Sequence, residues 1–222
     1  MPGSPPQQLE QARSYLHRAD PVLARLIDER PGFDPRAWMA QLPPMDLFGA
    51  LIFQVTGQQL SVPSTRATIA RIQDLFGGHL PSPAELLRAD PDELRRAGLS
   101  RRKIATLRDL AERLSDGRLD PENLASLPGD ELIAQLTTVP GIGPWTVQGV
   151  MIIALGREDV VLPGDLALRK AVQAAYQLGH LPAPDEVLAI AEPWRPYRSL
   201  ATSYLFSAAF DRRGTPSAAR DT

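Results

Sequence analysis

Apolar residues recur along this chain at the spacing of helical turns, and no segment alternates convincingly between apolar and polar positions as a strand would. Asp or Ser stands before Pro at four places where a helical pattern begins, which is typical of an N-cap followed by a first turn. These pairs are Asp20-Pro21, Ser82-Pro83, Asp90-Pro91 and Asp120-Pro121. The pattern predicts an all-α fold, with helices near 8–18, 20–30, 46–59, 62–76, 91–97, 101–115, 165–177, 184–192 and 196–211.

The two ends of the chain, residues 1–8 and 213–222, are rich in Pro, Gly, Ser and Ala or are polar, so we expect flexible tails there. The longest clean apolar run, Val150 to Leu155, is far too short to span a membrane. The N-terminus has no apolar core of the kind that a signal peptide needs. A cytoplasmic protein without membrane contact is therefore expected.

The cysteine content and the net charge of the chain limit the functions that it can have. The chain has no cysteine, which excludes disulfides, thiolate zinc sites and cysteine-held iron–sulfur clusters. Its net charge of −2 is unusual for a nucleic-acid-binding protein, although backbone N–H groups and a local basic patch can still hold phosphates. The densest basic run is a candidate phosphate contact, and a solvated helix face is the alternative. It comprises Arg95, Arg96, Arg101, Arg102, Lys103 and Arg108.

A tight turn at residues 139–144, with the sequence VPGIGP, joins two predicted helices. Pro144 suits the first position of the second helix, because its missing N–H would be unpaired there in any case. Gly141 and Gly143 allow positive φ and close approach of another molecule to the backbone. The turn thus presents free N–H groups at a helix N-terminus, which favours anion binding, although an ordinary helix–turn–helix corner would have the same pattern.

The segment after this turn is apolar almost all round from Trp145 to Leu155 and is expected to be buried. About twenty residues beyond the turn, Pro163-Gly164-Asp165 opens the next helix. Asp165 is expected to act as an N-cap that accepts backbone N–H bonds. The helix N-terminus also favours the ionised form of this carboxylate.

The combination of the hairpin, the buried helix and Pro163-Gly164-Asp165 resembles the helix–hairpin–helix Gly/Pro…Asp superfamily of DNA glycosylases. Within it the chain most resembles the 3-methyladenine DNA glycosylase II (AlkA-like) branch. Two further stretches agree, ALIFQVTGQQLS at 50–61 and AEPWRPYRS at 191–199, and the resemblance runs from about Asp20 to Phe210. It implies two lobes, one of residues 9–45 plus 164–212 and one of 46–163, with the active site in a cleft between them. The extra N-terminal α/β domain of many members is expected to be absent.

The resemblance also implies roles for individual residues. Asp165 would be the catalytic carboxylate, and Trp145 would line the base pocket where bifunctional relatives carry a Schiff-base lysine. The enzyme would then be monofunctional. Gln59, with Leu60 as runner-up, would be the wedge that fills the gap left by the flipped base.

The resemblance also implies which residues would form the walls of the base pocket. Gly149 stands where relatives often carry an aromatic residue, so it would leave space beside Trp145. Phe206, or alternatively Tyr204, would supply the remaining aromatic wall. In the other interpretation a neighbouring side chain fills the gap at Gly149.

Phosphate and ion contacts complete the set that the resemblance implies. The expected phosphate contacts are Gly141, Gly143, Thr146, Arg101 and Lys103. The main-chain carbonyls of Thr137, Val139 and Ile142 would be the ligands of a structural monovalent cation, and no other cofactor is expected. The partner would be double-stranded DNA with alkylated bases, bound by a monomer that associates with the nucleoid in a prokaryote.

Two other functions fit parts of the pattern. A glycosylase for mismatched or oxidised bases would share the fold, but its two commonest forms carry cysteines or the hairpin lysine that this chain lacks. A non-catalytic helix–hairpin–helix DNA-binding module would need the hairpin alone. Such a module has no reason to carry Pro163-Gly164-Asp165 or the Gln58-Gln59 pair.

Overall fold

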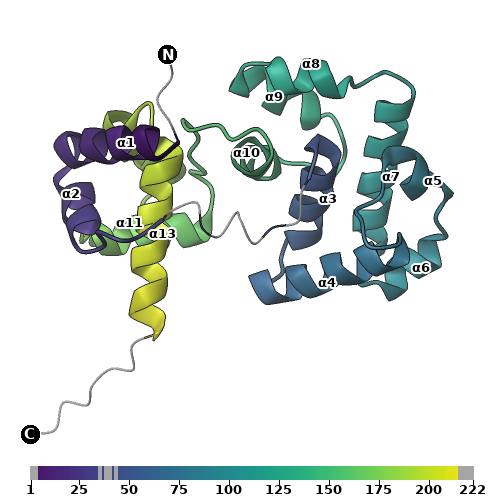
Figure 1. The fold of residues 1–222 in the computed structure, drawn as a ribbon, viewed down its shortest axis with the longest axis horizontal. Coiled ribbons are helices and arrows are strands. Elements are labelled where there is room, and N and C mark those ends of the chain that lie inside the picture. Colours follow the sequence, from purple (N-terminus) through teal and green to yellow (C-terminus); the bar gives the residue numbers. More distant parts are fainter. Residues whose placement is uncertain (1–4, 35–36, 38–41, 43–44, 215–222) are drawn as a thin grey trace, which may run out of the picture. The chain divides into compact units, whose positions relative to one another are not determined.

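The computed structural model describes residues 5–34, 37, 42 and 45–214, and the described part of the chain is helical with no strand (Figure 1). The predicted all-α fold is therefore confirmed. Four of the described helices begin at the predicted pairs with Pro: Asp20, Ser82, Asp90 and Asp120 each accept backbone N–H bonds at a helix start. Each is followed by Pro at the first helical position, where a missing N–H is harmless.

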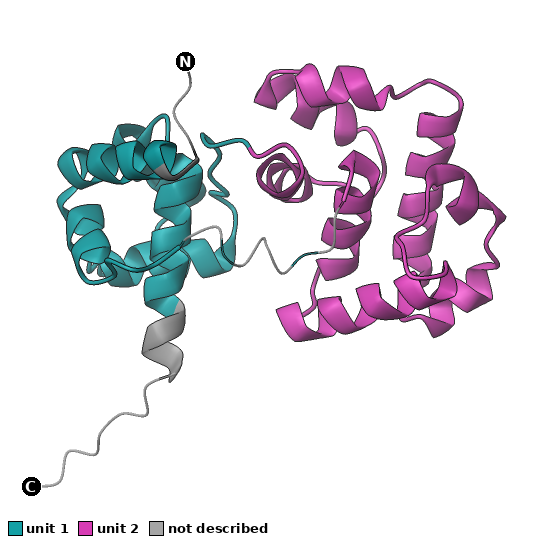
Figure 2. Cartoon of the chain, in the orientation of Figure 1, with its two compact units in different colours: residues 1–42, 157–222 teal, residues 43–156 magenta. Residues whose placement is uncertain are grey.

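The chain divides into two compact units, one of residues 1–42 with 157–222 and one of 43–156 (Figure 2). The first unit contains α1 (Pro5–Ala19), α2 (Pro21–Asp28), α11 (Leu166–Ala175), α12 (Pro184–Ala191), η2 (Glu192–Trp194) and α13 (Arg198–Gly214). Within it α13 packs against α11 and α2, and α1 packs against α2. Its core includes the fully buried Leu16, Leu23, Val172 and Trp194.

The second unit contains α3 (Leu47–Gly57), α4 (Val62–Leu75), α5 (Pro83–Arg88), α6 (Pro91–Arg96), α7 (Arg101–Ser115), α8 (Pro121–Ser126), α9 (Gly129–Leu136) and α10 (Pro144–Ile153). Helix α3 is buried over most of its length, because its sequence is apolar on every side. It packs against α4 and α10, while α7 packs against α5. This arrangement fixes α3 and the hairpin helix α10 side by side.

Residues 157–163 belong to the unit of the terminal helices, whereas the sequence prediction placed them in the central lobe. The reason is the hydroxyl of Ser199, at the start of α13. It donates to the carbonyl of Arg157 (2.8 Å) and accepts from the amide of Val160 (3.1 Å). The carboxylate of Asp159 also accepts from Arg195 and Arg198. The loop that leads to Asp165 is therefore fastened to α13.

The predicted tails differ from the structure at their inner ends. Residues 5–8 begin α1 and residues 213–214 end α13. Two prolines at positions 5 and 6 are compatible with a helix start, since the first turn needs no N–H donors. The rest of both predicted tails, 1–4 and 215–222, lies outside the described residues. None of the described helices is long and apolar enough to cross a membrane.

Candidate active site

The hairpin between α9 and α10 is a close-packed turn. Gly141 has φ +92°, and a Cβ there would lie 2.2 Å from the hydroxyl oxygen of Thr106 on α7. Glycine is therefore required both for the left-handed backbone and for the contact. The Thr106 hydroxyl donates to the carbonyl of Pro140 (2.8 Å), and the amide of Ile142 donates to the carbonyl of Val139 (3.0 Å).

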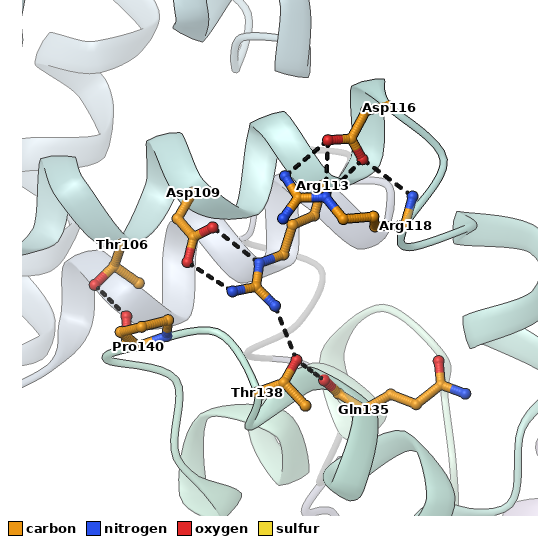
Figure 3. A network of polar contacts seen from close by, with 8 residues as sticks. All are labelled: Thr106, Asp109, Arg113, Asp116, Arg118, Gln135, Thr138 and Pro140. Carbon is orange, nitrogen blue, oxygen red and sulfur yellow. Dashed lines mark hydrogen bonds and ion pairs between the residues drawn. The ribbon is translucent and has the colours of Figure 1, made fainter.

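A second polar link fastens the hairpin to α7 (Figure 3). The Arg113 guanidinium makes a two-pronged ion pair with Asp109 on its own helix and also donates to the hydroxyl of Thr138 (3.1 Å). Thr138 in turn donates to the carbonyl of Gln135 at the end of α9 (2.7 Å). The first half of the turn is thus held at Thr138 and Pro140 from one helix.

The N-terminus of α10 has no side-chain cap: Gly143 occupies the capping position, and a Cβ at Gly143 would meet nothing within 4 Å. Its first N–H groups are therefore suited to an external anion. Thr146, however, is only 2% exposed, and its hydroxyl accepts from the Gln58 side-chain amide (3.0 Å). The Thr146 hydroxyl therefore holds Gln58, and the contact of Thr146 with phosphate stays a prediction.

The turn after α3 has an unusual backbone. Gln59 has φ +60°, although it is not glycine, and its side chain is exposed together with that of Leu60, which is 41% exposed. A left-handed glutamine costs about 1 kcal/mol or more and persists only where its surroundings fix it. Gln58 donates to the Gly141 carbonyl (3.0 Å) as well as to Thr146, so the turn is fastened to the hairpin.

Lys103 is the second restraint on this turn. Its ammonium donates to the carbonyls of Thr56 (2.8 Å) and Gln58 (2.9 Å), which flank the C-terminus of α3. Partial burial lowers the pKa of Lys103. Two of the three donors of Lys103 therefore hold the Gln59 turn, and its contact with a DNA phosphate stays a prediction.

We expect Lys103→Met to slow any reaction that needs the Gln59 turn by about 5-fold, the equivalent of one net hydrogen bond of about 1 kcal/mol. The salt dependence of DNA affinity should hardly change. Arg102→Met is the matched control, since Arg102 is exposed and adjacent. Its loss should reduce the slope of log K against log salt by about one. A loss of slope in Lys103→Met equal to that in Arg102→Met would contradict the positioning role.

The other members of the basic run divide into two groups. Arg108 donates to the carbonyls of Leu87 and Ala89 at the end of α5, and Arg95 and Arg96 pair with Asp92 and Glu93 on α6. The side chains of these three arginines therefore bind other groups of the protein itself. Arg101 and Arg102 are exposed and have no ion pair among the described residues. They are the available cations of the run.

A hollow of about 390 Å³ lies where these features meet. It is lined by Gln58, Gln59, Ser100, Arg102, Lys103, Thr106 and Trp145. Trp145 is 36% exposed, in contrast to Val147 and Val150 on the same helix, which are fully buried. An exposed indole, an exposed glutamine turn and an arginine therefore border one concave surface.

The space expected at Gly149 is filled. A Cβ at this position would lie 2.4 Å from Nε2 and 2.5 Å from Cδ of Gln54 on α3. The Gln54 carboxamide thus occupies the volume that a side chain at position 149 would take. The structure therefore agrees with the second interpretation, in which a neighbouring side chain, here Gln54, fills the gap at Gly149.

Asp165 is the N-cap of α11: its Oδ1 accepts from the amide of Leu168 (2.8 Å). The side chain is partly exposed, beside the exposed Gly164 and Leu166. The buried residues Val160, Val161 and Leu162, fastened by Ser199, lead into it.

The two aromatic residues proposed for the pocket wall differ in their surroundings. Tyr204 is fully buried and packs edge-on against Phe33, with ring centroids 5.3 Å apart. It is part of the core of the first unit. Phe206, on the same helix α13, is partly exposed and remains the better candidate of the two.

A family model, the HhH-GPD superfamily of base excision DNA repair proteins, matches residues 52–196. This range includes the Gln58-Gln59 turn, the hairpin and Asp165. The chain belongs to this superfamily.

Similar members of the HhH-GPD superfamily agree over most of the chain. DNA-3-methyladenine glycosylase 1 of Schizosaccharomyces pombe is 32% identical over 200 residues, which are 89% of this chain and 86% of that protein. DNA-3-methyladenine glycosylase 2 of Escherichia coli is 29% identical over 83% of this chain and 64% of its own length. The solved S. pombe enzyme, in complex with abasic DNA, superposes with a TM-score of 0.81 at 30% identity, covering 90% of this chain and 97% of that one.

Three of the residues described above were not singled out by the sequence. Gln54 was quoted only as part of a motif, Arg102 only as part of a charge run, and Ser199 only as part of the stretch 191–199. The one available signal was spacing: Gln54 and Gln58 are four residues apart and so lie on the same face of α3. Nothing in the sequence indicated that this face meets α10 at Gly149.

Proposed function

We propose that this protein is a DNA glycosylase that releases alkylated bases, including 3-methyladenine and 7-methylguanine, from double-stranded DNA. The observation that carries the proposal is the concave surface shared by the left-handed Gln59 turn, the exposed Trp145 indole and Arg102. A wedge, an aromatic face and a phosphate contact are what an enzyme needs to extrude a base from a duplex. The names of the S. pombe and E. coli relatives support the substrate class.

Asp165 would supply the chemistry. As the bond between C1′ and the base nitrogen breaks, the bonding electron pair leaves with the base and positive charge develops on the sugar. A fixed carboxylate beside the sugar stabilises that charge, and water then adds at C1′. A base alkylated at N3 or N7 is already cationic and departs as a neutral molecule, so no general acid is needed for it. One carboxylate is therefore sufficient, unlike the pair used by O-glycoside hydrolases.

The wedge and the phosphate contacts would come from the second unit. Gln59 and Leu60 are exposed at the tip of their turn, where either can enter the stack of bases. The uncapped N-terminus of α10, with Gly141 and Gly143, would hold a phosphate, and Arg101 and Arg102 would hold others. The carbonyls of Thr137, Val139 and Ile142 are the candidate ligands of a monovalent cation at the hairpin. We also propose that the enzyme acts as a monomer.

The product should be an intact strand with an alkali-labile abasic site. Trp145 stands where bifunctional relatives carry a lysine, and an indole cannot form a Schiff base with the sugar. Incubation with methylated DNA should therefore leave the strand uncut until alkali is added. Reduction with borohydride during turnover should trap no covalent protein–DNA adduct, and a trapped adduct would show that another amine acts as the nucleophile.

The experiment that tests the function itself is release of free bases from DNA treated with a methylating agent, measured by mass spectrometry. We expect 3-methyladenine and 7-methylguanine to appear in proportion to active enzyme. Unmethylated DNA is the control. Tight binding to abasic-site DNA without release of any base would instead indicate a non-catalytic helix–hairpin–helix module.

A further inference from the structure

Gln54 is a buried polar residue without an evident structural purpose. It lies on α3, is 8% exposed and packs its carboxamide against Gly149 of α10. Its Nε2, Cδ and Oε1 would lie 2.4, 2.5 and 2.8 Å from a Cβ at position 149. Among the described residues no hydrogen bond to its side chain is found. Its carboxamide atoms are not among the fully buried polar atoms without a partner, so they reach solvent on this face and remain able to pair with a ligand.

Gln58, one helical turn further along α3, is the contrasting case. Its amide nitrogen donates to the Gly141 carbonyl and to the Thr146 hydroxyl, both at 3.0 Å. That glutamine fastens α3 to the hairpin. Gln54 faces the same helix but makes no such bond, so the packing of α3 against α10 does not account for a polar residue at this position.

The place of the carboxamide indicates what it would contact. Positions 145 and 149 are four residues apart on α10 and lie on the same face of the helix. Because the Gln54 carboxamide fills the volume of the missing side chain at 149, it presents a donor and an acceptor on the face that carries Trp145. Trp145 is the exposed indole of this helix.

We propose that Gln54 determines which extruded base is preferred, by pairing with the base edge that carries N7 and the 6-substituent. This inference rests on the proposed glycosylase function. A glutamine amide can pair in two-pronged fashion with adenine, accepting from the 6-amino group and donating to N7. 3-Methyladenine retains both groups. 3-Methylguanine offers only acceptors on this edge, and 7-methylguanine has a methyl group on N7, so each can pair with the amide once at most.

The comparison of 3-methyladenine with 3-methylguanine isolates this contact, because both bases are alkylated at the same nitrogen and differ in the edge that Gln54 would read. DNA treated with a methylating agent contains both, so their release rates can be measured in one single-turnover reaction by mass spectrometry. The wild-type protein is expected to favour 3-methyladenine. Gln54→Met, which has a similar volume and cannot form these hydrogen bonds, should reduce the rate ratio by about 10-fold.

Gln54→Glu provides the opposite shift. A carboxylate still accepts from the 6-amino group of 3-methyladenine but repels the 6-oxygen of 3-methylguanine, so the rate ratio should rise above that of the wild type. A residue that matters only for packing would change both rates together in either variant. Thermal melting followed by circular dichroism reports whether each variant is folded.

The outcomes separate this inference from the function on which it rests. If the wild-type protein releases no alkylated base, the proposed function is wrong. If it releases them and the ratio of 3-methyladenine to 3-methylguanine is unchanged in Gln54→Met and in Gln54→Glu, the function stands and the role of Gln54 is refuted. If Gln54→Met is unfolded, the rate ratio in Gln54→Glu tests the role of Gln54: a rise above the wild-type ratio supports it, and an unchanged or lower ratio refutes it.

Discussion

Asp165→Asn should reduce base release by about 10²–10³-fold or more, because the amide cannot stabilise the positive charge that develops on the sugar. The fold should be kept. Asparagine is as good an N-cap as aspartate, and its oxygen can still accept from the amide of Leu168. The variant should therefore bind DNA that contains an abasic-site analogue nearly as well as the wild type. Single-turnover release of 3-methyladenine is the measurement.

Asp90→Asn is the matched control for this substitution. Asp90 is also an N-cap, of the short helix α6, and its Oδ1 accepts from the amide of Asp92 (2.9 Å). The same chemical change there should leave base release unaltered. If Asp165→Asn is stably folded and retains near-normal turnover, Asp165 serves only as a cap and the catalytic carboxylate must be sought elsewhere.

Local features of this fold were predictable because their causes lie within a few residues. A capping side chain, a Pro at the first helical position and a Gly in a left-handed turn each act over one helical turn, so Asp20-Pro21 and Gly141 could be interpreted directly. Asp165 was predictable in the same manner as an N-cap. Its catalytic role stays a prediction that the substitution above would test.

Contacts between distant segments could not be predicted in this way. Lys103 belongs to a basic run, and only the folded chain shows its ammonium on the carbonyls of Thr56 and Gln58, some 45 residues away in sequence. Gln54 meets Gly149 across the packing of α3 on α10, which no local pattern encodes. In both cases the sequence indicated the type of group but not its partner, and the partner decides whether the group positions the backbone or faces a ligand.

The stretch 191–199, by which the chain resembled its superfamily, has a structural role that centres on a buried carboxylate. Asp20 is 6% exposed. One of its oxygens caps α2 by accepting from the amides of Val22 and Leu23. The other accepts from the Tyr176 hydroxyl (2.5 Å) and from the indole N–H of Trp194 (3.0 Å). Burial and the bond to Asp20 raise the pKa of Tyr176, so this hydroxyl remains a donor.

Asp20→Ala is therefore expected to destabilise the protein strongly. The change removes a helix cap, at about 1 kcal/mol, and leaves the buried Trp194 N–H and the partly buried Tyr176 hydroxyl without acceptors, at about 1–3 kcal/mol each. The total loss should be about 3–7 kcal/mol in the free energy of unfolding, measured by urea denaturation. Since Tyr176 ends the helix that Asp165 begins, base release should fall at temperatures where the variant is still mostly folded.

Asp120→Ala is the control variant. It removes a cap whose carboxylate accepts only from an exposed amide (3.1 Å) among the described residues, so it should cost no more than about 1 kcal/mol in the free energy of unfolding. Equal losses in the two variants would show that the Asp20 bonds to Tyr176 and Trp194 contribute nothing beyond the cap.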